Sequence, residues 1–292
     1  MTIENWFFAI RPKTLTAAVA PVIIGAAMAF DEGRAHWLSA MLCLLGAVLI
    51  QIGTNLANDY FDYVKGTDTS ERIGPVRVTQ AGLISPDVVK KSFIIVFALA
   101  AVIGGLLALR GGWPIVVIAV LSVMSGILYT AGPKPLGYLG LGEIFVLIFF
   151  GPVAVGGTYY VQTLEIHAPV LIAGLAPGFL SVAILAVNNL RDIDGDRKSG
   201  KRTLAVRFGD MFGRWEYFVS MILAALIPAA LMLMTQSHVW VVFSSVAIMI
   251  LSRRLIQDVT LKSDGATLNG VLAQTGQLLL IYAVIFSAGW MA

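Results

Sequence analysis

Residues 37–62 read WLSAMLCLLGAVLIQIGTNLANDYFD, and this stretch decides the kind of fold. Its first part, Trp37–Ala57, is mostly apolar and uncharged, and it has about the 20 residues that a helix needs to cross a bilayer. Carboxylates follow immediately, at Asp59 and Asp62. The sequence therefore predicts a membrane-spanning helix that runs into an acidic motif.

Eight further apolar stretches accompany this one. The nine run Thr14–Phe30, Trp37–Ala57, Ser92–Leu109, Trp113–Thr130, Leu141–Val161, Ala168–Val187, Trp215–Met234, Val239–Ile256 and Val271–Met291. Because the runs are continuous and do not alternate, a membrane β-barrel is excluded. Charged residues make up 13% of the 292 residues, against about 25% in soluble domains, so a soluble protein is excluded as well. We expect an all-α fold: one membrane domain over residues 1–292 with nine transmembrane helices.

Lysine and arginine are sorted between the two sides of these spans. If the N-terminus marks one side, 18 of the 20 basic residues fall on that side, and only Arg34 and Arg110 fall on the other. Basic residues favour the cytoplasmic face of a membrane. The distribution predicts a multi-pass protein of a prokaryotic plasma membrane, with a cytoplasmic N-terminus and an external C-terminus. It also accounts for the basic charge without a nucleic-acid partner.

Ten of the 17 acidic residues lie in two stretches on the predicted cytoplasmic side. In the first stretch, Asn55, Asn58, Asp59 and Asp62 fall within an arc of about 100° on a helix. Carboxylates three and four residues apart repel one another on a helix face. Such an arrangement at a membrane boundary therefore indicates a bound cation.

The second acidic stretch reads NNLRDIDGD from Asn188 to Asp196. Asn188, Asp192 and Asp196 are spaced four apart, so a continuous helix would hold them within about 80°. Asp194 would then face away from them. This stretch also follows the end of an apolar span, which predicts that its acids lie at the mouth of the helix bundle.

The two stretches form a repeat, because Asn58 and Asp62 lie 130 residues before Asn188 and Asp192. Oxygen ligands of this kind suit Mg²⁺, which combines a few carboxylates with water and phosphate oxygens. Basic residues follow both stretches, at Lys65, Arg72, Arg77, Lys198, Lys201 and Arg202. Two such units facing each other would hold two metal ions with a diphosphate between them.

On these residues the chain resembles the UbiA superfamily of intramembrane aromatic prenyltransferases. It is similar to the 1,4-dihydroxy-2-naphthoate polyprenyltransferase branch in RPKT from Arg11, in NDYFDYVKGTD from Asn58, and in GKRTLAVRFG from Gly200. The resemblance implies nine helices around a central cavity that is open sideways to lipid. It also implies two Mg²⁺ ions, a polyprenyl diphosphate donor and a dihydroxynaphthoate acceptor, which loses CO₂ to give demethylmenaquinone.

The resemblance and the residue types together predict a set of site residues, most of them within motifs 55–77 and 188–207. The metal ligands are Asn58, Asp59, Asp62, Asp68, Asn188, Asp192 and Asp196, where Asp68 takes the part of an acid that the superfamily places at the position of Gly66. The diphosphate-binding residues are Lys65, Arg72, Tyr129, Lys134, Lys201 and Arg202. The catalytic residues are Asp62, Asp192, Lys65 and Lys201. Arg72 and Arg77 are candidates for the acceptor carboxylate, which suits an arginine fork.

Three other hypotheses remain open. One is a sister prenyltransferase that acts on 4-hydroxybenzoate, haem or chlorophyllide. Another is a cation transporter, although a transporter would place its acids near the bilayer midplane rather than at the ends of spans. The third is a non-catalytic scaffold, which gives no reason for two matched acidic motifs. The sequence defines neither the prenyl chain length nor the oligomeric state.

Overall fold

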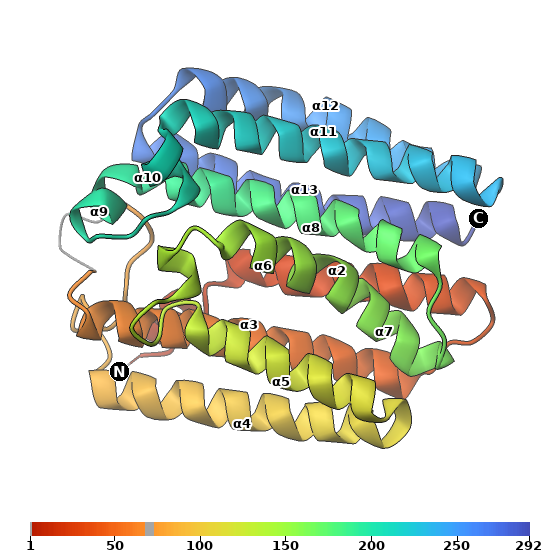
Figure 1. Ribbon diagram of the computed structural model, residues 1–292, viewed down its shortest axis with the longest axis horizontal. Helices are drawn as coiled ribbons and strands as arrows, with labels where there is room; N and C mark the ends of the chain where they lie inside the picture. Colours follow the sequence, from red (N-terminus) through yellow and green to blue (C-terminus); the bar gives the residue numbers. More distant parts are fainter. Residues whose placement is uncertain (1, 68–72) are drawn as a thin grey trace.

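Long helices run side by side in the computed structural model, which describes residues 2–67 and 73–292 (Figure 1). The long ones are α2 (Pro12–Asp31), α3 (Trp37–Val64), α4 (Pro86–Gly111), α5 (Trp113–Leu128), α8 (Ala168–Arg191), α11 (Asp210–Thr235), α12 (Val242–Leu261) and α13 (Gly265–Trp290). The shorter ones are α1 (Ile3–Ile10), η1 (Leu136–Tyr138), α6 (Gly142–Ile148), η2 (Phe149–Val153), α7 (Ala154–Thr163), α9 (Ile193–Lys198), α10 (Leu204–Phe208) and η3 (Val239–Val241).

Within the described residues, 8 helical segments are long and apolar enough to cross a membrane. One of them, Gly142–Thr163, is composed of α6, η2 and α7. α5 is also apolar but has only 16 residues. The predicted all-helical membrane fold is confirmed, and its nine stretches correspond to these eight segments and α5. Some predicted stretches are shorter than the helices that contain them: α3 extends to Val64, and α4 begins at Pro86.

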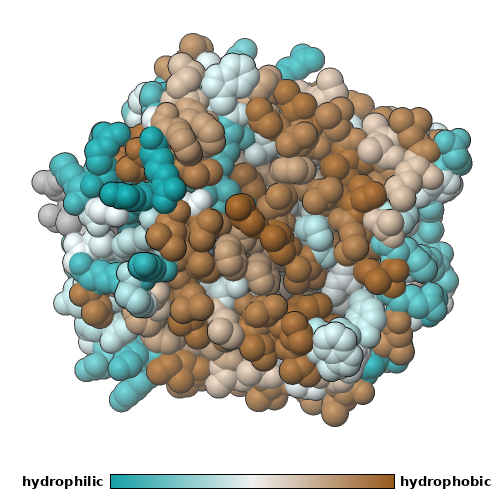
Figure 2. Space-filling model, in the orientation of Figure 1, coloured by the Kyte–Doolittle hydropathy of each residue, from teal (hydrophilic) through white to brown (hydrophobic). Residues whose placement is uncertain are grey.

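Polar residues gather at the two ends of the bundle. Figure 2 shows an apolar middle on one face, with hydrophilic residues at the left end and along the right edge. The two termini lie at opposite ends, as an odd number of crossings requires (Figure 1). The loops that follow α3 and α8 share the end that holds the N-terminus. Both acidic motifs are therefore brought to one end of the bundle.

Glycines let α8 approach the composite span closely. A Cβ atom on Gly151 would lie 2.7 Å from the carbonyl oxygen of Gly174, and one on Gly178 would lie 2.7 Å from that of Leu147. Small residues four apart allow membrane helices to pack backbone against backbone. The backbone of Gly151 leaves helical geometry within the π-helical segment η2, so the span bends here. The bend lies beside Phe150, which lines the cavity described below.

Two clusters of buried apolar side chains hold the bundle together. The larger cluster draws on α2, α7, α8, α11, α12 and α13. A second cluster draws on α1, α3, α4 and the loop that follows α3. Helices from both groups contribute side chains to a cavity that lies where the two clusters meet. The two walls of the candidate site, on α3 and on α8, therefore belong to different clusters.

Candidate functional site

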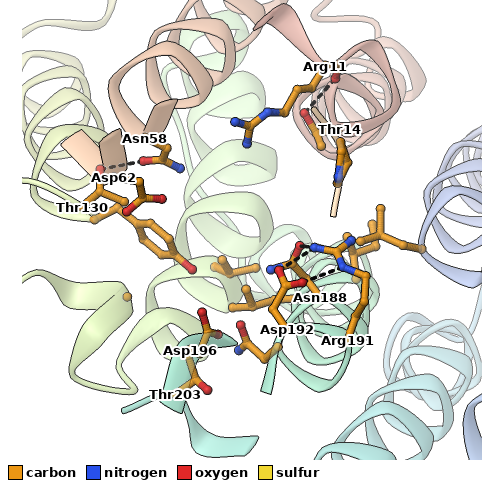
Figure 3. Close-up of a pocket in the computed structure, with 18 of the residues that line it drawn as sticks. Arg11, Thr14, Asn58, Asp62, Thr130, Asn188, Arg191, Asp192, Asp196 and Thr203 are labelled. Carbon is orange, nitrogen blue, oxygen red and sulfur yellow. Dashed lines mark hydrogen bonds and ion pairs between the residues drawn. The ribbon is translucent and has the colours of Figure 1, made fainter. Parts of the chain in front are cut away.

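A cavity of about 230 Å³ lies at the end of the bundle that carries the acidic motifs. Asn58 and Asp62 approach it from α3, while Asn188, Asp192 and Asp196 approach it from the other side (Figure 3). Two stretches 130 residues apart in the chain thus line a single space. The sequence located these residues by their spacing, and the fold supplies the juxtaposition.

Asp62 is the centre of a network that joins the two motifs. Its carboxylate is 1% exposed, and its Oδ1 accepts a hydrogen bond of 2.9 Å from the hydroxyl of Tyr138. Its Oδ2 lies 3.2 Å from Nη2 of Arg77 and 3.5 Å from Nζ of Lys201. The same ammonium nitrogen lies 3.9 Å from Oδ1 of Asp196. Lys201 therefore bridges carboxylates from both acidic motifs.

The second motif is not one continuous helix, contrary to the spacing argument. α8 ends at Arg191, Asp192 forms the junction, and α9 begins at Ile193. The amide of Asp196 still donates to the carbonyl of Asp192 at 2.8 Å, so the two carboxylates remain on one side. The side chain of Asp194 is 83% exposed, and it pairs with a neighbouring arginine on the outer surface. Asp194 therefore still lies apart from the site, although the helix is not continuous.

Arg191 orients this second motif, and it was not among the predicted site residues. Its Nε and Nη2 form a fork with both carboxylate oxygens of Asp192, at 2.8 and 2.6 Å. It also donates to Oδ1 of Asn188 at 2.9 Å and to Oδ1 of Asn269 on α13 at 2.7 Å. In the sequence, Arg191 is one of the 18 basic residues that predict the topology. Its position between Asn188 and Asp192 was the available signal.

The elbow between α1 and α2 supplies a further cation that the sequence analysis did not assign. Arg11 adopts a left-handed conformation with φ of 56° between the two helices, and it lines the cavity (Figure 3). Nδ2 of Asn55 on α3 donates to the carbonyl of Ile10 at 2.8 Å and to Oγ1 of Thr14 at 2.9 Å. The amide of Asn55 therefore holds the elbow between α1 and α2 in place instead of binding a ligand. This explains the local role of the RPKT segment.

Asp59, which was predicted as a metal ligand, makes its contacts with the loop that follows α3 and with Arg11. It is 1% exposed and does not line the cavity. Its Oδ2 and Oδ1 accept hydrogen bonds from the backbone amides of Val78 and Thr79, at 3.0 and 2.9 Å. Nη2 of Arg11 lies 3.8 Å from its Oδ2. Asp59 thus holds the loop after α3 against the helix, with the same loop supplying Arg77 to the cavity.

Replacing Asp59 with alanine is therefore expected to reduce stability before it affects chemistry. Two buried amides would lose their acceptor and the Arg11 guanidinium would lose its ion pair, at a cost of roughly 3 kcal/mol. Thermal unfolding of the purified protein in detergent should show a lower midpoint. If the midpoint were unchanged and only Mg²⁺ affinity fell, Asp59 would be a ligand after all.

Four of the predicted diphosphate-binding residues differ in their contacts and in their exposure: Lys65, Tyr129, Lys134 and Arg202. Nζ of Lys65 donates to the carbonyls of Thr130 and Gly132, at 2.6 and 3.0 Å, and partial burial lowers its pKa. Lys134 and Arg202 are exposed, and neither lines the cavity. Tyr129 does line it. Lys65 therefore holds the loop after α5 in this arrangement.

Two predicted residues, Asp68 and Arg72, lie outside the described residues. Tyr138, on η1, lies at the centre of the contacts that join the two motifs. Besides its bond to Asp62, its ring lies under the ammonium nitrogens of Lys65 and Lys201, at 4.8 and 4.9 Å from the ring centroid. A tyrosine face stabilises a nearby cation. Tyr138 therefore positions the lysine that bridges the two motifs.

A second cavity of about 250 Å³ adjoins the first and is mainly apolar. The two cavities share Gln51, Asn58, Tyr129, Val146 and Phe150. Its other walls include side chains from α2, α3, α5 and the composite span: Ala18, Pro21, Ala47, Ile50, Phe145 and Phe149. A polar, charged compartment thus adjoins a mainly apolar one, which suits a ligand with a charged head and a hydrocarbon chain.

The donor set in the first cavity fits a hard cation bound together with phosphate. Among the described residues, no group of three or more His, Cys, Asp or Glu side chains forms a ready metal cluster. Instead the carboxylates stand on two walls, with Asp62 beside Arg77 and Lys201, and Asp192 held by Arg191. All the candidate ligands are oxygens. Mg²⁺ prefers this arrangement, because it takes its remaining ligands from water and substrate phosphates.

Comparisons with known proteins agree with this chemistry. The model of the UbiA prenyltransferase family matches residues 18–269. The chain is 37% identical over 295 residues to a 1,4-dihydroxy-2-naphthoate octaprenyltransferase of Haemophilus influenzae, covering 98% of this chain and 96% of that protein. It is 40% identical over 280 residues to the Mycobacterium tuberculosis protein of the same name, covering 96% and 94%.

Solved structures share the fold. A UbiA homolog from Archaeoglobus fulgidus superposes with a TM-score of 0.68 at 16% identity, covering 99% of this chain and 100% of that chain. The same homolog bound to GPP and Mg²⁺ gives a TM-score of 0.66 at 15% identity, with the same coverage. The helical arrangement is thus a known one.

Proposed function

The chain belongs to the UbiA prenyltransferase family, and we propose that it transfers a polyprenyl group from polyprenyl diphosphate to 1,4-dihydroxy-2-naphthoate. Diphosphate and CO₂ would leave, and demethylmenaquinone would form. Relatives that carry this activity in their names, at 37% and 40% identity over nearly the whole chain, support the choice of acceptor. The observation that carries the proposal is Lys201, whose ammonium nitrogen lies 3.5 and 3.9 Å from carboxylates of the two acidic motifs.

We propose that Mg²⁺, as two ions, binds the oxygens of Asn58, Asp62, Asn188, Asp192 and Asp196. When bound, Mg²⁺ neutralises charge on the diphosphate and makes it a better leaving group. Mg²⁺ in the solved structure of the Archaeoglobus homolog with GPP supports this proposal at the level of the family.

The residues of the chain then have distinct tasks. Lys201, Arg77 and Arg11 line the charged cavity and provide cations for the diphosphate oxygens. Charge stabilisation of this kind helps most when it acts on charge that develops in the transition state. The adjoining apolar cavity receives the first isoprene units of the donor chain. The allylic C1 becomes cation-like as diphosphate departs, the naphthoate ring attacks it, and no protein nucleophile is required.

The acceptor carboxylate has one remaining candidate among the described residues. Arg77 lines the cavity, although its Nη2 already contacts Asp62 at 3.2 Å. The contact with Asp62 favours a role for Arg77 in binding the diphosphate. Because Arg77 lines the cavity, it is also a candidate for binding the acceptor carboxylate. Arg77→Lys should raise the donor KM if the first role holds, and the acceptor KM if the second does.

The proposed activity is tested with purified protein, Mg²⁺, a polyprenyl diphosphate and dihydroxynaphthoate. Prenylated product, diphosphate and CO₂ should appear in equal amounts. A parallel reaction with 4-hydroxybenzoate provides the matched comparison. If only 4-hydroxybenzoate were prenylated, the naphthoate acceptor would be wrong and the sister activity correct.

We also propose that the N-terminus and both acidic motifs face the cytoplasm and that the C-terminus lies outside. The sorting of 18 basic residues to one side supports this orientation. In a Cys43→Ala background, a cysteine placed at Ser199 should be protected from impermeant thiol reagents in intact cells. A cysteine at Glu165, which lies on the loop before α8, should be labelled. The reverse pattern of labelling would invert the topology.

A further inference from the structure

Glu143 is a buried acid to which the proposed reaction gives no task. It lies in the first turn of α6 and is 7% exposed. Its Oε1 accepts a hydrogen bond of 2.9 Å from Nδ2 of Asn189 on α8. Its Oε2 is buried and has no hydrogen-bond partner within the described part of the chain. A buried acid with so little compensation is costly, and such residues in membrane proteins commonly serve a function.

The contact with Glu143 determines how the amide of Asn189 is turned. Nδ2 of Asn189 donates to Oε1 of Glu143, so the nitrogen of the Asn189 amide faces Glu143. The amide oxygen, Oδ1, is then left to face elsewhere. Asn189 is 6% exposed and lines the charged cavity, so its available hydrogen-bonding group toward that cavity is an acceptor.

Asn189 lies on a different strip of α8 from the metal motif. Ser181, Leu185 and Asn189 are spaced four apart and all line the cavity. The neighbouring strip carries Asn188 and leads to Asp192. Glu143 draws Asn189 toward α6, whose side of the cavity also includes the apolar Val146. Val146 and Leu185 thus give the cavity an apolar lining on the α6 side and along the strip of Asn189.

The chemistry of this position suits the aromatic acceptor. An amide oxygen repels phosphate oxygens, but it accepts a hydrogen bond from a ring hydroxyl. We propose that Asn189 binds a ring hydroxyl of the acceptor, and that Glu143 is the positioning residue that holds the Asn189 amide in the required orientation. This inference rests on the proposed function, because it assumes a hydroxylated aromatic acceptor.

Steady-state kinetics of Glu143→Gln test the inference. Glutamine has the same shape, but it can donate as well as accept, so the Asn189 amide is free to turn over. The acceptor KM should rise roughly five- to tenfold, the effect of about one hydrogen bond, while the donor KM stays within twofold. Asn189→Leu should raise the acceptor KM at least as much. Adding Glu143→Gln to Asn189→Leu should cause no further rise, because the contact is already gone.

Glu216→Gln is the matched control. Glu216 is a partly buried acid, its Oε2 likewise has no hydrogen-bond partner among the described residues, and it shares a mainly apolar groove with Glu143. It makes no contact with Asn189, so both KM values should remain within twofold. Thermal unfolding of each variant separates a loss of fold from a change in binding.

Three outcomes would overturn the inference. The first is an unchanged acceptor KM in both Glu143→Gln and Asn189→Leu. The second is a rise in the donor KM or in the Mg²⁺ requirement in place of the acceptor KM. The third is an additive effect in the double variant. Failure of the wild-type protein to prenylate dihydroxynaphthoate would instead contradict the proposed function. The ratio of the acceptor KM of each variant to that of the wild type therefore tests the inference. The reaction of the wild-type protein with dihydroxynaphthoate tests the proposed function.

Discussion

Replacing Asp62 or Asp192 with alanine is expected to lower turnover by roughly 10²–10⁴-fold, with the double variant little worse than either single one. Both carboxylates line one cavity, and Lys201 links the first of them to Asp196 of the second motif. If the two motifs hold one diphosphate through shared metal ions, loss of either wall disables the whole site. Independent sites would instead give multiplied effects.

The measurement is the rate of diphosphate release from purified variants at saturating Mg²⁺. Asp194→Asn is the control, because the side chain is 83% exposed on the same motif and points away from the cavity. It should retain activity within about threefold of wild type, as is usual for exposed substitutions away from a site. A chelator should abolish wild-type turnover, and added Mg²⁺ should restore it. Full activity in the chelator would exclude the proposed metal chemistry.

The membrane fold could be predicted from the sequence because its signal is local. An apolar run such as Trp37–Ala57 must span the bilayer as a helix, since no water satisfies its backbone groups there. The ends of helices were less predictable. The acidic residues of the first motif lie on the last turns of α3, which continues to Val64, because a charged face at the membrane boundary does not end a helix.

The site could be predicted only as far as spacing along one element allows. Asn58 and Asp62 share a helix face, and both line the cavity. Asp59 was predicted to act with them, and its oxygens accept hydrogen bonds from the amides of Val78 and Thr79. A loop that folds back from 19 and 20 residues away decides this, and helical spacing carries no information about it.

Residues that act through distant partners were the ones missed. Arg191 faces Asp192 in its own motif, but its contact with Asn269 on α13 depends on the packing of two spans. The role proposed for Glu143 depends on its contact with Asn189, which forms only where α6 packs against α8. Lys134, a predicted diphosphate-binding residue, is exposed and does not line the cavity. A count of charges cannot show which of them point inward.

Lys201→Met is expected to have the second largest effect, a loss of roughly 10²–10³-fold in kcat/KM for the donor. Removing the ammonium leaves Asp62 and Asp196 facing each other without the cation that now lies 3.5 and 3.9 Å from them. It also removes a cation that contacts diphosphate in the proposed reaction, and an interaction that strengthens as the leaving group gains charge contributes several kcal/mol. The side chain is 14% exposed, so water cannot fully replace it.

Arg197→Gln is the control for Lys201→Met, because it removes one positive charge from the adjoining helix α9. Its side chain is 58% exposed and pairs only on the outer surface with Asp194, so the expected change is less than threefold. Lys201→Arg should recover part of the activity, since the charge remains while the geometry over the Tyr138 ring changes. If Lys201→Met and Arg197→Gln lowered kcat/KM equally, the effect would be one of general surface charge. A selective loss in Lys201→Met with an unchanged acceptor KM would instead place this ammonium at the departing diphosphate.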